Sequence, residues 1–214
     1  MTWLQVWLWL AYASLAFELL FLAVPSEAST WQILRANAAS ASPALAVVRA
    51  RSRLARLAFY ALPTAIGIVL FAVPLVASLW PPVLRWLWPL SWLAHEPVAV
   101  LGLLIATLGR AIALTAVVQL RRKRGSELAV AELAPKGLFA WSRNPGLVGM
   151  FTFYIGLCLV TPCAVLAAGF VLYAVNMHRR VLIEEDSLRS LLGTPFVEYC
   201  HRVPRYLGIT SAPR

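Results

Sequence analysis

Four long apolar stretches dominate this sequence and restrict the folds that it can adopt. They cover residues 3–24, 57–80, 98–120 and 147–177. An α-helix needs roughly 20 apolar residues to cross the hydrocarbon core of a bilayer, and each stretch meets that length. Only 13% of the residues are charged, whereas a soluble domain carries about 25%. We therefore expect an all-α polytopic membrane protein that forms one folded unit.

The last apolar stretch is too long for one ordinary span. It contains the step Thr161-Pro162 near its centre, and a proline disfavours helical geometry at the residue before it. This pattern predicts a helical hairpin, with a fourth helix to about residue 160 and a fifth helix over about 163–183. The chain then has about five transmembrane helices. Residues 1–97 hold the first two, and residues 98–214 form a core with the last three and a C-terminal segment.

The positions of the basic residues favour five helices over four. With five, seventeen of the nineteen Lys and Arg residues fall on one side of the membrane. This is the positive-inside pattern, and it predicts an outside N-terminus and a cytoplasmic C-terminus, in a bacterial inner membrane. The net charge of +10 does not indicate nucleic-acid binding, because the chain has no soluble basic domain. We expect no metal site, since the three cysteines form no CxxC pair and no HExxH motif occurs.

A loop before the fourth helix, residues 136–150, reads "KGLFAWSRNPGLVGM". Its glycines allow close backbone approach. Arg143 can hold a carboxylate or phosphate with two hydrogen bonds. The open N-terminus of the fourth helix also favours an anion. The alternative is an ordinary basic loop beside the membrane, with Pro145 at the start of a helix.

Residues 179–193, "RRVLIEEDSLRSLLG", gather a third of the chain's acids at one place. If the fifth helix continues past residue 183, Arg180 and Glu184 can pair, as can Glu185 and Arg189. Glu184 and Glu185 are adjacent, so they point to different sides of a helix. We expect one of them to face the bundle near Arg143, at a site for an amine or a cation. The alternative is ordinary salt bridging on a helix that leaves the membrane.

A third polar group, "FVEYCHRVPRYLG" at residues 196–208, can dock on the bundle through its apolar side chains. In this order, the three groups resemble the isoprenylcysteine carboxyl methyltransferase and phospholipid methyltransferase family of membrane enzymes. The resemblance covers residues 102–207. Asn144 stands where many members of the family have His, and Leu147 stands where the family pattern has Tyr.

The resemblance implies an S-adenosylmethionine-dependent methyltransferase with a cytosol-facing cofactor pocket. The donor would contact residues of the loop, one acid and one tyrosine: Lys136, Gly137, Leu138, Phe139, Arg143, Asn144, Pro145, Gly149, Glu184 and Tyr199. We assign catalytic roles to Glu185, Arg110 and Asn144, with Glu185 as the base if the acceptor is an amine or a hydroxyl. Arg110, inside the third span, would touch the acceptor or bind Glu185; alternatively, it pairs with a backbone carbonyl or with Glu18.

The acceptor is expected to be a lipid-like or small apolar molecule that enters from the bilayer and carries a carboxylate, an amine or a thiol. The sequence leaves its identity and the oligomeric state open. Two other functions remain compatible with the pattern. One is an NADPH-dependent membrane enzyme like the sterol reductases, which share a similar C-terminal helical arrangement. The other is a non-catalytic membrane scaffold of the same fold.

Overall fold

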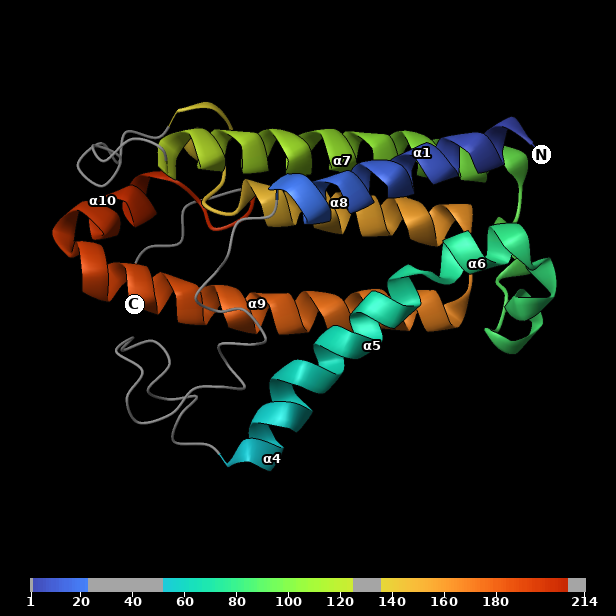
Figure 1. Cartoon of the computed structure of the whole chain (residues 1–214), viewed down its shortest axis with the longest axis horizontal. Helices are drawn as coiled ribbons and strands as arrows, with labels where there is room; N and C mark the ends of the chain where they lie inside the picture. The colour runs from blue at the N-terminus through green and yellow to red at the C-terminus, as the bar shows by residue number, and fades with distance from the viewer. Residues whose placement is uncertain (1, 23–51, 125–135, 208–214) are drawn as a thin grey trace.

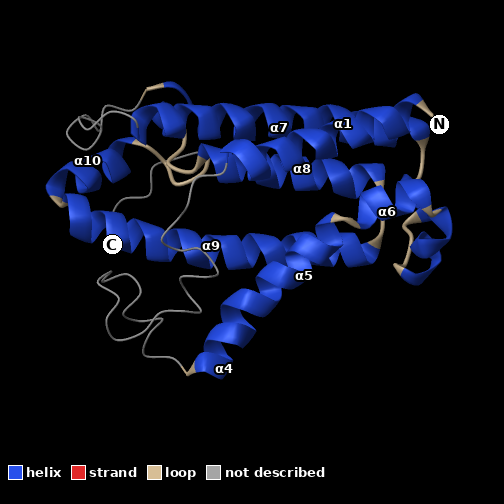
Figure 2. Cartoon of the chain, in the orientation of Figure 1, coloured by secondary structure: helices blue, strands red, loops and turns tan. Residues whose placement is uncertain are grey.

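The computed structural model describes residues 2–22, 52–124 and 136–207, and all regular secondary structure in these ranges is helical (Figures 1 and 2). The long elements are α1 (Trp3–Phe17), α5 (Leu62–Phe71), α7 (Glu96–Arg124), α8 (Pro145–Val160) and α9 (Ala164–Leu192), followed by the short α10 (Thr194–Arg202). The expectation of an all-α chain is therefore confirmed for the described residues. Most of the chain between the first two apolar stretches lies outside them.

Three helical stretches are long and apolar enough to cross a membrane: Trp3–Leu22, Arg53–Leu79 and Glu96–Arg121. Helix α8 is apolar but shorter, with 16 residues. Many apolar side chains on these helices point outward, among them Leu10, Ile68 and Val69. Such a surface is costly in water and suits lipid, so the chain is a membrane protein.

The first helix is fixed at its start by a capping box, in which the Thr2 hydroxyl accepts from the backbone of Gln5 and the Gln5 side chain accepts from the backbone of Thr2. Indole groups then attach it to its neighbours. Trp7 donates to the Thr107 hydroxyl on α7 at 2.8 Å. Trp9 donates to the Ser78 hydroxyl on α6 (Val73–Leu79) at 3.0 Å.

The second apolar stretch is helical but irregular because of its two prolines. It starts as α4 (Arg53–Arg56) and a π-helical turn, η3 (Leu57–Ala61), and continues as α5 and α6. Pro63 follows the π-helical turn, and a break at Ala72 precedes Pro74. Proline has no backbone N–H, so each of these residues interrupts the regular hydrogen bonds of the helix.

Helices α7 and α8 are antiparallel and pack through a seam of small residues. Cβ atoms built on Gly149 and Gly156 would lie 2.6 and 2.5 Å from the carbonyl oxygens of Gly109 and Gly102 on the facing helix. Only glycine allows backbones to approach so closely. Next to this seam lies the main core, which includes Leu103, Phe153, Tyr154, Leu157 and Leu166.

The predicted hairpin is present, with α8 ending at Val160 and α9 starting at Ala164. Its turn is held by the connection between α6 and α7, because Leu90 donates to the carbonyl of Pro162 and Ala164 donates to that of Trp88. This turn and the N-terminus lie at one end of the bundle. Helix α10 and the start of α8 lie at the other end (Figure 1).

The predicted end of the fifth helix at residue 183 is wrong. Helix α9 continues through the three acids to Leu192 and stops at Gly193. This glycine has a φ of +61°, a left-handed conformation that residues with a side chain rarely adopt. The chain reverses there, and Phe196 and Tyr199 of α10, together with Val203 just after it, pack against Leu188 and Leu192 of α9.

Candidate functional site

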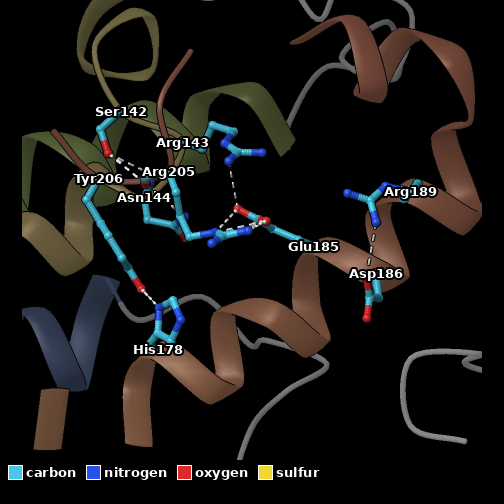
Figure 3. A network of polar contacts seen from close by, with 9 residues as sticks. All are labelled: Ser142, Arg143, Asn144, His178, Glu185, Asp186, Arg189, Arg205 and Tyr206. Carbon is cyan, nitrogen blue, oxygen red and sulfur yellow. Dashed lines mark hydrogen bonds and ion pairs between the residues drawn. The ribbon is translucent and has the colours of Figure 1, made fainter. Parts of the chain in front are cut away.

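The polar residues of the three sequence groups meet at the α10 end of the bundle (Figure 3). Three segments contribute: the loop that follows η7 (Gly137–Ala140), helix α9, and residues 203–206 after α10. We call residues 203–206 the C-terminal strap. The expectation that the Arg143 and Glu185 segments lie side by side is therefore met in the structure.

Glu185 is the centre of this site. It is 5% exposed, and its carboxylate lies between two guanidinium groups. Arg205 of the C-terminal strap donates from Nε to both carboxylate oxygens at 3.0 Å and from Nη2 to Oε2 at 2.8 Å. Arg143 places its Nη2 3.6 Å from Oε1. Two cations and one anion leave the cluster with a net positive charge, so it suits an anionic group.

The electrostatics of Arg205 follow from this geometry. Its hydrogen bonds to Glu185 raise the pKa of its guanidinium above the ordinary value. Arg143 is more enclosed, with its side chain 6% exposed against 29% for Arg205. The Nε of Arg143 is buried and has no hydrogen-bond partner in the described part of the chain.

The loop and the C-terminal strap are held together mostly through the backbone. Arg143 donates its N–H to the carbonyl of Pro204 at 2.9 Å. The side chains of Ser142 and Asn144 both donate to the carbonyl of Arg205, each at 3.2 Å. The Ser142 hydroxyl also accepts from the backbone N–H of Asn144 at 3.1 Å. The amide of Asn144 thus positions the strap.

A second set of contacts orders the start of the loop. Gly137 has a φ of +63° and lies against the Gln119 side chain, which accepts from the N–H of Leu138 at 3.2 Å. The Tyr199 hydroxyl donates to the carbonyl of Phe139 at 2.9 Å. Burial raises the pKa of Tyr199 to about 12, although the nearby Arg143 lowers it. Trp141 points outward.

The other two acids of the group lie apart from Glu185. Asp186 is exposed and pairs with Arg189 at 3.3 Å, so the expected pairing of Glu185 with Arg189 is wrong. The reason is the bend at Gly193, which brings Arg205 back onto the buried face of α9 where Glu185 points. Glu184 is half-buried and interacts electrostatically with Arg180.

Arg110 takes the alternative partner that the sequence offered. It donates to Glu18 at 2.5 Å and to the hydroxyl and carbonyl oxygens of Ser14 at 3.0 and 3.1 Å. Its guanidinium also lies 5.5 Å from the ring centre of Phe153. Glu185, by contrast, binds Arg205 and Arg143. The suggested Arg110–Glu185 pair is therefore wrong, because each partner is engaged at a different depth of the bundle.

The remaining predicted site residues lie around this cluster in different ways. Pro145 is buried in the first turn of α8, and Lys136 is exposed before η7. Gly149 packs against α7, where its role is helix packing. Three residues near the cluster were not singled out as site residues from the sequence: Arg205, His178 and Tyr206. His178 Nδ1 lies 3.0 Å from the Tyr206 hydroxyl (Figure 3).

Arg205 belongs to a Val-Pro-Arg step at residues 203–205, but nothing in the sequence connects this step to Glu185, which lies 20 residues earlier.

Searches against protein-family models, curated proteins and solved structures found no match to this chain. Its functional interpretation therefore depends on the order of its motifs and on the chemistry of the cluster.

Proposed function

We propose that this protein is an integral membrane methyltransferase that uses S-adenosylmethionine and acts on a lipid-like or small apolar acceptor. The observation that carries the proposal is the buried Arg143–Glu185–Arg205 cluster. It unites residues from all three sequence groups that resemble the methyltransferase family. Two buried or half-buried guanidiniums at the end of a helical bundle can anchor the carboxylate of the donor's methionine part.

In this proposal Glu185 organises the two guanidiniums instead of taking a proton. Both of its carboxylate oxygens accept hydrogen bonds from Arg205, which leaves it poorly suited to act as a base. Glu184, half-buried on the neighbouring face of α9, is assigned to the donor's ammonium group. Leu138 and Phe139 of η7 and Tyr199 of α10 are assigned to the adenine, because the Tyr199 hydroxyl joins these two elements through its hydrogen bond to the carbonyl of Phe139.

The bound donor would supply a sulfonium-activated methyl group. The contribution of the protein is alignment, since an acceptor lone pair must approach the methyl carbon opposite the sulfur, with the reacting atoms roughly 3–3.5 Å apart. We further propose five spans, with α8 and α9 as the fourth and fifth, an outside N-terminus and a cytoplasmic cluster. An apolar acceptor would then reach the site from the bilayer.

The two other functions predict different ligands. A reductase of the sterol-reductase type would bind NADPH, and a scaffold would bind neither NADPH nor S-adenosylhomocysteine. The purified protein in lipid nanodiscs should therefore be titrated with each compound by calorimetry. We expect binding of S-adenosylhomocysteine alone. Binding of NADPH alone, or of neither compound, would refute the proposal.

Variants connect that binding to the cluster. Arg143→Gln and Glu185→Gln should each weaken S-adenosylhomocysteine binding at least about tenfold, because the first removes a guanidinium that would hold the ligand's carboxylate and the second releases both guanidiniums from the position in which Glu185 holds them. Asp186→Asn is the matched control, since it removes the same charge one residue away at an exposed position. Equal loss in the control would show that the effect does not arise in the cluster. Incubation with labelled S-adenosylmethionine and a lipid extract from the host should then yield a labelled product.

A further inference from the structure

A cavity lies at the other end of the bundle, far from the Glu185 cluster. Its volume is about 340 Å³, within the range of about 300–1,000 Å³ that ligand pockets occupy. It is enclosed by the first turns of α1, by α6, by the start of α7 and by the α8–α9 turn. These elements gather at the N-terminal end of the bundle in Figure 1, whereas α10 marks the opposite end.

The cavity lining is mostly apolar, with a few polar residues. It includes the buried residues Leu8 and Leu103, which are 3% and 0% exposed, and Ala77. Gln5 and Ser78 also line it, but their polar atoms are engaged: Gln5 donates to the carbonyl of Ser78, and the Ser78 hydroxyl accepts from Trp9. The polar groups of these two residues are therefore not available to bind a ligand. A hollow of this kind suits an aliphatic chain.

The lining also contains one acidic residue, Glu96, and its charge determines which head group such a ligand can carry. His95 and Glu96 are among the residues that line the cavity, and both are exposed. No Lys or Arg lines the cavity, and no ion pair to Glu96 occurs among the described residues. A carboxylate at the exposed edge of an apolar cavity attracts an ammonium group and repels a phosphate or carboxylate.

We propose that this cavity binds an amphipathic amine, with its aliphatic chain between α1, α6 and α7 and its ammonium group at Glu96. The site is separate from the proposed methyl-donor site, and it does not depend on that function. Leu84 and Leu93 line the cavity and belong to the segment that carries the exposed Trp80, Trp88 and Trp92, and indole rings of this kind mark the membrane–water interface. An amine with one alkyl chain would lie there with its ammonium group at the interface and its alkyl chain toward the apolar interior.

The test uses dodecylamine with a diazirine at the end of its chain, and the matching alcohol as the control probe. The protein in nanodiscs is irradiated with each probe, and labelled peptides are mapped by mass spectrometry. We expect the amine to label residues 4–8 and 99–103 about two- to five-fold more than the alcohol does, the range that one weak ion pair gives. Labelling of the lipid-facing Ile68 and Val69 should not differ between the probes.

Two variants check the assignment. Glu96→Gln should abolish the preference for the amine, whereas the control Glu198→Gln, on α10, should retain it. Ala99→Leu should reduce labelling of residues 4–8 by both probes, because it fills the cavity. Equal labelling of the cavity by amine and alcohol in the unmodified protein, or stronger labelling by a fatty-acid probe, would overturn the proposal. The comparison in the unmodified protein does not require any variant to fold.

Discussion

Replacing Glu185 by Gln is the perturbation that the structure predicts most sharply. The change preserves shape but leaves Arg143 and Arg205 close together without their shared anion. Removing one partner of a buried ion pair costs about 3–5 kcal/mol. Arg205 is 29% exposed and can turn partly toward water, so we expect the lower end, about 3 kcal/mol. For a chain of this length, that corresponds to a fall in Tm of roughly 6–12 °C.

The assay is thermal unfolding in one detergent, monitored by tryptophan fluorescence. It is applied to Glu185→Gln, Arg205→Gln and the double variant. Because the double variant also removes one of the two cations left unpaired, it should be less destabilised than the sum of the single variants, and its Tm should lie close to that of Arg205→Gln. Asp186→Asn removes a pair whose side chains are more than half exposed, worth about 0–1 kcal/mol, and should shift Tm little. A Glu185→Gln protein as stable as Asp186→Asn would refute the buried network.

Three further predictions concern packing, the buried ion pair and pH. Gly149→Ala should destabilise the protein by about 1–3 kcal/mol in thermal unfolding, because the added Cβ would meet backbone atoms of α7 at 2.5–2.6 Å. Gly146→Ala should have little effect, because the nearest atom to its added Cβ is 3.7 Å away. Equal effects of the two changes would show that α7 and α8 do not pack closely at Gly149. Glu18→Gln should lower Tm because it strands the buried Arg110, and the double change to Glu18→Leu and Arg110→Met should recover much of the loss; no recovery would argue against simple charge burial. Since burial raises the pKa of Tyr199 to about 12, the unfolded chain loses this proton first, near its ordinary pKa of about 10. The contribution of Tyr199 to stability should therefore be constant below about pH 10 and be lost as pH rises from about 10 to 12, so the fall in stability over this range should be smaller in Tyr199→Phe. An identical fall in both proteins would contradict the assignment.

The parts of the fold that depend only on hydropathy could be predicted from the sequence. The apolar stretches and the Thr161-Pro162 step predict the helices and the α8–α9 turn because membrane-spanning backbone must satisfy its own hydrogen bonds. Helix α9 was predicted too short because its last third leaves the apolar segment, and hydropathy does not signal a helix that continues in water. Its end depends on Gly193, whose positive φ is a local property that hydropathy ignores.

The candidate site was predictable only in part. Adjacent positions on a helix point in different directions, so the sequence implied that one of Glu184 and Glu185 faces the bundle, and Glu185 does so. Its main partner, Arg205, could not be predicted, because the pairing depends on the direction of α10 after Gly193. Arg110 had several possible partners, namely the acceptor, Glu185, a backbone carbonyl or Glu18, and the outcome depends on how α1 packs beside α7. Long-range pairing of this kind is a property of packing, not of spacing.

The most direct test of the central claim is calorimetric titration of the purified protein in nanodiscs with S-adenosylhomocysteine, carried out in parallel on Glu185→Gln and Asp186→Asn. The account predicts saturable binding to the unmodified protein and to Asp186→Asn, and binding at least about tenfold weaker to Glu185→Gln. If the unmodified protein shows no binding, or if all three proteins bind equally, the guanidinium cluster around Glu185 is not a methyl-donor site.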